Sequence, residues 1–234
     1  MSQRPLLLFF AALGTLTPVL GFLLVMLGIA EPYLTSNIVA GAILVGMLGA
    51  IAVPFLPLRD RGATLREQVL DLLVIWTWAS ALAQFGWELP FVLLSPTLKG
   101  VTANDHWFFL FWSYGVADQR YLIADPFTVC MEAVTSMIGG PLEIYVLYLF
   151  KRGRLRTAVY WAVIISATQL YGTVLFFGIE ALEGFRHVGQ GAANVWIKFV
   201  GLNGVWMVMP VVCLFAYYKG ILGGLEEKGS AGSR

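Results

Sequence analysis

Carboxylate and amide side chains stand inside three stretches of this sequence that are apolar enough to cross a membrane. Glu88 lies in VLDLLVIWTWASALAQFGWELPFVLL, Glu132 in FTVCMEAVTSMIGG and Asn203 in KFVGLNGVWMVMP. Such groups cost several kcal/mol in hydrocarbon and usually face a partner, a cavity or a substrate. Two buried carboxyl groups without an obvious basic partner need protonation or a cationic ligand, which is the chemistry of an acid–base or cation-binding site.

Helical geometry predicts that these groups share one depth. At about 1.5 Å per residue, Glu88 and Glu132 each lie roughly 9 Å inside the nearer helix end, and Asn203 lies about 12 Å inside. Further polar or aromatic side chains fall roughly 13–16 Å deep on the same side. These are Gln84, Thr135, Thr173 and Trp206. Spacings of three or four residues place the members of a pair on one helix face, so the pairs could line one pocket. The pairs are Gln84/Glu88, Glu132/Thr135 and Asn203/Trp206.

Most of these residues also have a structural explanation when each is taken singly. Gln84, Thr135 and Thr173 are typical of interhelical hydrogen bonds, and Trp206 is typical of helix packing. Asn203 fits either explanation. The carboxyl groups are harder to explain in this way, because a buried charge needs compensation.

Three other charged residues lie near the ends of apolar segments. Lys198 is the only basic residue inside a span that could pair with the carboxyl groups, and we expect it to extend to the interface instead. Glu143 and Glu180 lie nearer the ends of their helices, and we expect both at the interface.

The composition indicates a polytopic membrane protein. Of the 234 residues, 59% are hydrophobic and 12% are charged, with a mean hydropathy of +0.77, whereas an ordinary soluble domain has about 25% charged residues. The net charge of +1 does not suggest nucleic acid or an acidic partner. Cys130 and Cys213 fall in apolar runs and are expected to be small buried hydrophobes. Neither His106 nor His187 has a metal-ligand spacing, so no metal or cofactor is implied.

About 20 apolar residues are needed for a helix to span the hydrocarbon, and this rule predicts an all-α bundle of six spans. The spans are 5–29, 38–58, 69–94, 127–150, 157–182 and 195–222. The first could be a cleaved signal peptide, but its apolar stretch is longer than the usual core of about 7–15 residues, which favours a retained helix. We therefore divide the chain into 1–37 (N-terminal helix and linker), 38–222 (membrane domain) and 223–234 (polar, disordered tail).

Basic residues in the loops predict the orientation. They gather on one side of the predicted membrane, which places both termini in the cytoplasm. They are Arg4, Arg59, Arg61, Arg66, Lys151, Arg152, Arg154, Arg156, Lys219 and Lys228. The longest loop, 95–126, lies on the other side, and its aromatic residues predict that it lies in the interface or caps the bundle. It ends in Asp125-Pro126, a typical helix start.

Three segments resemble the emopamil-binding proteins, which are the sterol Δ8–Δ7 isomerases of the EXPERA group. The segments are ADQRYLIADPFTVCMEAVTSMIGGPL (117–142), QLYGTVLFFGIEALEGFRH (169–187) and VGLNGVWMVMP (200–210). The similarity runs from about residue 69 to about residue 220. The family core has five spans, which implies that the last five spans here form this core and that the helix at 5–29 is an additional element.

The resemblance also implies site residues. The family's working residues are spaced H-x-x-x-E, E-x-x-T and N-x-x-W. In this sequence, Glu132 and Thr135 match the second pair, Asn203 and Trp206 match the third, and Glu88 matches the Glu of the first. The position of the family histidine is occupied by Gln84. A glutamine cannot exchange a proton at a useful pKa, although it can orient Glu88 by hydrogen bonding.

By resemblance, the leading hypothesis is an isomerase that shifts a ring double bond of a sterol or another polycyclic isoprenoid. The ring alkene is protonated, a tertiary carbocation forms, and a neighbouring proton is lost. Glu88 would donate or accept the proton, oriented by Gln84. A second group, Glu132, Asn203 and Trp206, would hold the cation, with Thr135 supporting Glu132.

The same resemblance implies binding of lipophilic amines, because an ammonium mimics the carbocation. Two alternatives stay open: an enzyme on this scaffold with a different isoprenoid substrate, and a non-catalytic binder of sterols or amines. A transporter or channel is weaker, because we find no inverted repeat. The sequence does not determine the direction of isomerisation or whether the protein forms a homodimer. The resemblance implies the endoplasmic reticulum membrane in a eukaryotic host, and the inner membrane in a bacterial one.

Overall fold

The computed structural model describes residues 3–57 and 64–218. Two parts of the sequence-based predictions lie outside these residues. One is the tail, 223–234. The other is the set of loop basic residues Arg59, Arg61, Lys219 and Lys228.

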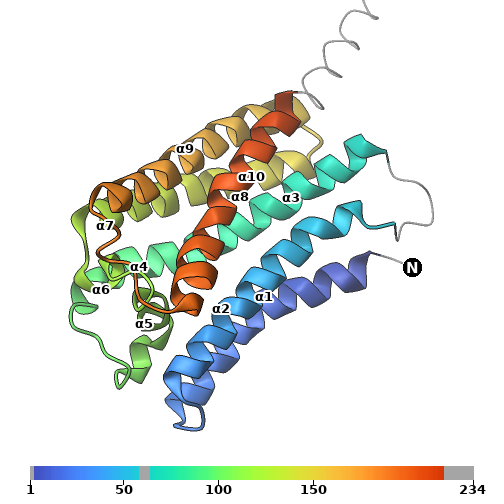
Figure 1. Cartoon of the computed structure of the whole chain (residues 1–234). Helices are drawn as coiled ribbons and strands as arrows, with labels where there is room; N and C mark the ends of the chain where they lie inside the picture. Colours follow the sequence, from blue (N-terminus) through green and yellow to red (C-terminus); the bar gives the residue numbers. More distant parts are fainter. Residues whose placement is uncertain (1–2, 58–63, 219–234) are drawn as a thin grey trace, which may run out of the picture.

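Within the described residues, six helical segments are long and apolar enough to cross a membrane, and none of the described residues forms a named strand. The predicted all-α bundle is confirmed (Figure 1). The second segment begins at Pro32, earlier than the predicted residue 38. The six segments are Arg4–Met26, Pro32–Phe55, Leu65–Thr97, Pro126–Lys151, Leu155–Leu182 and Ala193–Ala216.

Ten α-helices occur in the described residues, and α5 and α6 lie in the connection between the third and fourth segments. The helices are α1 (Arg4–Met26), α2 (Pro32–Ala52), α3 (Leu65–Ala83), α4 (Leu89–Leu94), α5 (Phe109–Gly115), α6 (Arg120–Ile123), α7 (Pro126–Val134), α8 (Gly140–Lys151), α9 (Leu155–Leu182) and α10 (Asn203–Ala216). Short 3₁₀ turns occur at η1 (Val53–Phe55), η3 (Ser95–Thr97) and η4 (His106–Phe108).

Three π-helical stretches interrupt the spans: η2 (Gln84–Glu88), η5 (Thr135–Gly139) and η6 (Ala193–Leu202). The first two end just before Pro90 and Pro141. Proline has no backbone N–H and its ring clashes with the carbonyl four residues earlier, so a wider turn relieves the conflict. Such stretches often occur at functional sites, and these contain Gln84, Glu88 and Thr135, while Asn203 directly follows the third.

Side-chain capping explains where two of the spans begin. The Asp125 carboxylate accepts hydrogen bonds from the backbone N–H and the hydroxyl of Thr128, both at 2.9 Å, and Pro126 is the first residue of α7. The helix start predicted at Asp125-Pro126 is therefore confirmed. At α3, Thr64 and Glu67 form a capping box.

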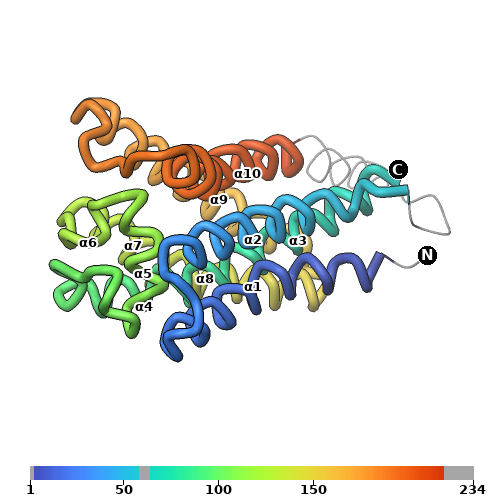
Figure 2. The backbone as a smooth tube through the Cα atoms, turned by 60° about the horizontal axis from the view of Figure 1, so that its bottom comes forward, coloured from blue at the N-terminus to red at the C-terminus, as the bar shows by residue number. Residues whose placement is uncertain are grey.

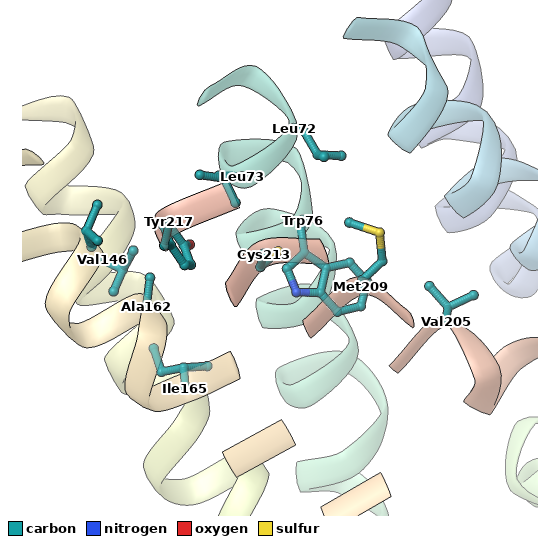
Figure 3. Close-up of a cluster of buried hydrophobic side chains, with 11 residues drawn as sticks. Leu72, Leu73, Trp76, Val146, Ala162, Ile165, Val205, Met209, Cys213 and Tyr217 are labelled. Carbon is teal, nitrogen blue, oxygen red and sulfur yellow. The ribbon is translucent and has the colours of Figure 1, made fainter. Parts of the chain in front are cut away.

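The largest hydrophobic core lies among α3, α8, α9 and α10 (Figure 3). Its buried members are Leu72, Leu73, Trp76, Val146, Val159, Ala162, Ile165, Val205, Met209, Cys213 and Tyr217. The prediction of a buried Cys213 is confirmed, whereas Cys130 is exposed on the outside of α7, where the prediction of a buried residue was wrong.

The connection 95–126 folds over one end of the bundle, at the end away from the N-terminus (Figures 1 and 2). It is tied to the segment after α9 by backbone hydrogen bonds from Gln119 to His187, 2.9 Å, and from Gly189 to Ala117, 2.9 Å. Phe109 and Trp112 of α5 are buried against Val25 of α1. The aromatic residues of this connection therefore cap the bundle, which is one of the two predicted arrangements.

Helices α1 and α2 run side by side along the bundle (Figure 2). Their closest approach depends on glycine. A Cβ at Gly46 would lie 2.8 Å from the backbone nitrogen of Gly14 and 2.8 Å from the carbonyl oxygen of Phe10. Because these neighbours are backbone atoms, they cannot move aside as a flexible side chain would.

We therefore expect Gly46→Val to destabilise the protein by about 1–3 kcal/mol, because overpacking would force α1 away from α2. Thermal unfolding in detergent measures this effect. Gly41→Val is the matched control, since a Cβ at Gly41 meets no atom within 4 Å. Equal melting temperatures for the two variants would contradict the close packing of α1 on α2.

Candidate active site

Glu88 and Glu132 lie next to each other in the interior of the bundle. Glu88 is the last residue of η2, and Glu132 lies on α7. Their side chains are 9% and 6% exposed, and the two carboxyl groups interact at close range. Two carboxylates buried so close together repel each other and lose their hydration, which favours a proton on one of the two groups. The structure thus brings together the two carboxyl groups that the sequence singled out.

Each carboxyl group is held by a hydroxyl from a different element. Thr135 Oγ1 donates to Glu88 Oε2 at 2.5 Å, and the Tyr121 hydroxyl donates to Glu132 Oε1 in a short hydrogen bond. By resemblance, Thr135 was expected to support Glu132. Thr135 instead links α7–η5 to Glu88, because the Glu132 side chain is turned toward Tyr121 of α6.

Gln84 does not make the expected contact with Glu88 in the described hydrogen bonds. Its Nε2 donates to Ser80 Oγ at 3.3 Å and to Glu143 Oε1 at 3.4 Å. Helical side chains lean toward the N-terminus of their helix, so Gln84 reaches back toward Ser80. The buried carboxylate of Glu143 on α8 then attracts its amide group.

Three expectations about charged residues were wrong. Glu143 and Glu180 were expected at the interface, but their side chains are 1% and 0% exposed inside the fold. Lys198 was expected to extend to the interface, but it is 2% exposed. Its Nζ donates to Ser36 Oγ at 2.6 Å and to Asn194 Oδ1 at 3.0 Å. In each case a polar partner on another turn or helix offsets the cost of burial, and sequence position alone does not reveal that partner.

Asn203 connects to the carboxyl pair through two tyrosines. Its side chain exchanges hydrogen bonds with the Tyr114 hydroxyl at 2.6 and 2.9 Å, and the Tyr114 and Tyr121 rings meet edge to face with centroids 4.8 Å apart. Burial raises the pKa of both tyrosine hydroxyls, with nearby acidic groups adding to the effect. Both phenols therefore stay protonated donors at neutral pH, and Tyr121 can hold Glu132 without becoming charged.

Trp206 lies apart from the carboxyl pair. Its ring packs edge to face against Trp76, with centroids 5.0 Å apart, and its backbone carbonyl accepts a hydrogen bond from Thr173 at 3.3 Å. The structure therefore gathers Glu88, Glu132 and Thr135 directly and joins Asn203 through tyrosines, while Gln84 and Trp206 contact other groups.

Arg120 anchors the segment that carries Tyr121. Its guanidinium bonds Asp118 at 2.6 Å, lies 3.4 Å from Glu180 Oε2 and covers the Phe176 ring at 3.9 Å. Burial raises the pKa of the Asp118 carboxyl, although the hydrogen bonds from Arg120 oppose this effect. This buried network fixes α6 against α9, and so sets the direction from which Tyr121 approaches Glu132.

One group of side chains in the described residues has a geometry that could hold a metal ion. It consists of Glu180, Glu183 and His187, with His187 Nδ1 3.1 Å from Glu180 and 3.2 Å from Glu183. A search for spacings such as HExxH does not find it. Because Glu180 already faces Arg120 and the backbone N–H of His187, we interpret the group as part of the Arg120 network.

The arrangement can move protons at a buried, largely apolar site and can stabilise a positive charge there. Two residues that hold the site were not predicted from the sequence, Tyr114 and Tyr121. Three others form the polar cluster around Gln84 and were not predicted there: Ser80, Glu143 and Gln169. Tyr121 and Gln169 lie within segments already singled out, at RYLIAD and QLYG, and these segments were the available signals. No periodicity or spacing distinguishes Ser80, Tyr114 or Glu143 before the helices are placed.

Comparison with known proteins finds one family model, described as EXPERA (EXPanded EBP superfamily), over residues 107–217. Among curated proteins, the 3-beta-hydroxysteroid-Delta(8),Delta(7)-isomerase of Cavia porcellus is 30% identical over 184 residues, which is 77% of this chain and 79% of that protein. The Rattus norvegicus protein of the same name is 37% identical over 111 residues, 47% of this chain and 48% of that protein.

A more distant similarity involves a plant protein with another name. The isomeliandiol synthase of Melia azedarach is 21% identical over 174 residues, covering 74% of this chain and 81% of that protein. The matched part of this chain spans about half the length of the rat and mouse relatives, 48% and 54%. The family-model match includes Glu132, Thr135, Asn203 and Trp206 but begins after Glu88.

We expect Arg120→Met to destabilise the protein by about 3–5 kcal/mol, because it leaves Asp118 and Glu180 buried without their cation. Arg186→Met is the matched control, since it removes an exposed arginine paired with Glu183 and should cost at most about 1 kcal/mol. Thermal unfolding of both variants in the same detergent compares them. If Arg120→Met melted at the wild-type temperature, the network would not be the anchor described above.

Proposed function

Since the chain belongs to the EXPERA (expanded EBP) superfamily, we propose that it is a membrane isomerase that shifts a ring double bond of a sterol or a related polycyclic isoprenoid. One observation carries the proposal. Glu88 and Glu132, from two different spans, lie buried next to each other in the apolar interior, where their mutual repulsion favours a proton on one group and leaves the other able to accept one.

The pair provides both proton transfers that the reaction needs. The π electrons of the ring alkene take the proton of Glu88, which leaves a carboxylate and a tertiary carbocation at the other alkene carbon. The C–H bond of a neighbouring carbon then supplies the electrons of the new double bond, and its proton passes to a carboxylate of the pair. The proton count of the protein is unchanged after one turnover, and the reaction needs no cofactor.

The surrounding groups suit the charged intermediate. Thr135 holds Glu88 and Tyr121 holds Glu132, so the carboxyl groups are oriented before substrate arrives. Asn203 is proposed to line the substrate side of the site beside Tyr114, whereas Trp206 packs on Trp76 apart from the carboxyl pair and is given no part in holding the cation. A lipophilic amine should bind at the same place, because its ammonium carries the charge of the intermediate.

A non-catalytic binder of sterols or lipophilic amines is the second candidate. The observation in its favour is the contact of Gln84, whose amide lies on Glu143 and Ser80 and thus makes no described hydrogen bond to Glu88. A binder would keep the carboxyl pair for a cationic ligand and would show no turnover. The name of the Melia azedarach relative supports a third version, in which the same chemistry acts on another isoprenoid.

The bilayer placement of the chain follows from its six apolar segments, and its orientation is part of the proposal. The start of α1, the start of α3 and the turn between α8 and α9 lie at one end of the bundle (Figure 1), and these segments carry Arg4, Arg66 and the basic residues of 151–156. We propose that this end faces the cytoplasm. The membrane would be that of the endoplasmic reticulum in a eukaryotic host and the inner membrane in a bacterial one. A homodimer is compatible with the proposal but is not needed by it.

The decisive test follows a Δ8-sterol incubated with the purified protein in deuterated water. We expect a Δ7 product that contains deuterium, detected by mass spectrometry, because the added proton comes from an exchangeable carboxyl group. Glu88→Gln should reduce turnover at least about 100-fold, since an amide cannot supply that proton.

The same variant separates the two candidate functions. Binding of a lipophilic amine to Glu88→Gln should stay within a few-fold of wild type, while Glu132→Gln should weaken both binding and turnover. Glu183→Gln, a surface carboxyl change, is the control. Wild-type protein that binds the amine but leaves the sterol unchanged would favour the binder.

Gln84→His tests the departure from the family pattern. Histidine titrates near neutral pH, so a nearby imidazole should speed proton transfer if the pocket already accepts sterol. We expect turnover of the Δ8-sterol to rise in this variant, measured by product formation per minute. Sterol binding without any gain in turnover would instead point to a different isoprenoid substrate.

A further inference from the structure

The turn between α8 and α9 concentrates positive charge at one end of the bundle (Figure 1). Its basic residues are Lys151, Arg152, Arg154 and Arg156, and all of these side chains are exposed. Within the described residues, none of them forms an ion pair, and the first turn of α9 contains no acidic residue. The charge of this turn therefore has no negative partner in the part of the chain that the structure describes.

The end of α8 does not use these side chains for its own hydrogen bonds. Basic side chains near the C-terminus of a helix can bond its last free carbonyl groups. Here the carbonyls of 148–150 already accept the backbone N–H groups of 152–154, each at 3.0 Å. Gly153, with a φ of 69°, allows the backbone to close the helix in this way. The basic side chains are thus left to interact with a group outside the turn.

One of the four cations is held against an aromatic ring. The guanidinium of Arg152 lies over the ring of Tyr148, 5.2 Å from its centroid. Tyr148 stacks on Tyr145 with centroids 6.4 Å apart, and Tyr145 meets Trp161 of α9 edge to face, also at 6.4 Å. An arginine that lies on an aromatic ring keeps the N–H groups along its edge available, and these match the oxygens of a phosphate group.

The turn lies at the level of the lipid headgroups. Lys151 is the last residue of the fourth membrane segment and Leu155 is the first residue of the fifth, so the turn joins two spans directly. Tyr148 and Tyr160, 48% and 62% exposed, lie about one helical turn inward from it on α8 and α9. Exposed aromatic residues near the ends of spans are typical of the headgroup level. The anionic groups nearest to this turn are therefore lipid phosphates.

The tendency of basic loops to stay on one side of a membrane requires charge alone, and it does not explain a guanidinium held on a ring. A zwitterionic lipid offers a phosphate together with its own cation, whereas a cluster of basic residues beside a span favours a headgroup with net negative charge. We propose that the turn 151–156 binds the headgroup of an anionic phospholipid. Arg152, held by Tyr148, contacts the phosphate, and the other basic residues of the turn neutralise the remaining charge.

This site is separate from the proposed reaction and does not depend on it. The connection 95–126, which supplies Tyr121 to the carboxyl pair, caps the opposite end of the bundle (Figures 1 and 2). Lipid binding at the turn and chemistry at Glu88 and Glu132 can therefore be measured independently.

The test counts the lipids that the purified full chain retains in detergent, by native mass spectrometry. Dioleoyl phosphatidylglycerol is compared with dioleoyl phosphatidylcholine at equal concentrations. We expect the dissociation constant for phosphatidylglycerol to be lower by at least about fivefold, which is the contribution of one basic residue at an anionic surface.

Variants separate the ring from the charge. Arg154→Gln should weaken the binding of phosphatidylglycerol about fivefold. Tyr148→Leu keeps every charge but removes the ring under Arg152, and it should weaken binding about two- to fivefold. Tyr148→Phe keeps the ring and should bind as wild type does. Arg186→Gln is the matched control, because it removes an exposed arginine that follows the other end of α9.

Four results would overturn the proposal. Equal retention of both lipids by the wild type would mean that the turn is merely hydrated. Unchanged binding in Tyr148→Leu would exclude a ring-held arginine, and an equal loss in Arg186→Gln would indicate diffuse charge. Displacement of phosphatidylglycerol by an equal concentration of inorganic phosphate would assign the site to free phosphate. Because no step measures sterol turnover, failure here is distinguishable from failure of the proposed isomerase activity.

Discussion

The burial of two carboxyl groups next to each other in the interior of a membrane bundle is the constraint on which the rest of this structure depends. Glu88 and Glu132 come from different spans, and neither has a basic residue beside it within the described hydrogen bonds and ion pairs. The fold must therefore supply neutral donors to both. Thr135 does so from the span of Glu132, and Tyr121 does so from the connection that caps the bundle.

The π-helical stretches around Glu88 and Glu132 help to bring their hydrogen-bond donors into place. The stretches η2 and η5 lie opposite each other, and each ends just before a proline. A wider helical turn changes which side chains face inward, so it can bring Glu88 and Thr135 to the same place without a break in the span. Arg120 then holds the connecting segment through ion pairs with Asp118 and Glu180. Within the described residues it forms no ion pair with either carboxyl group of the site, although its charge and that of Asp118 act on Glu132.

Two tiers of carboxyl groups follow from this arrangement. The upper tier, Glu88 and Glu132, is a pair of neighbouring carboxyl groups, each held by one hydroxyl, while the lower tier, Glu143, is surrounded by amide and hydroxyl donors. Gln84 lies between them and belongs to the lower tier. The replacement of the family histidine by glutamine is thus accompanied by a neighbouring carboxylate that holds the amide. This explains physically why Gln84 does not orient Glu88.

The sequence by itself determined the spans, because about 20 apolar residues can satisfy their backbone only as a helix. It also determined the start of α7, through the side chain of Asp125 and the fixed φ of Pro126, and it identified Glu88 and Glu132 as groups that need a partner. Tertiary structure alone decided which partner each one has. Thr135 was expected on Glu132 and lies on Glu88; Glu143 and Lys198 were expected at the interface and are buried. The reason is that hydrogen bonds between helices depend on rotation and local helix width, and a change of one residue per turn redirects every side chain that follows.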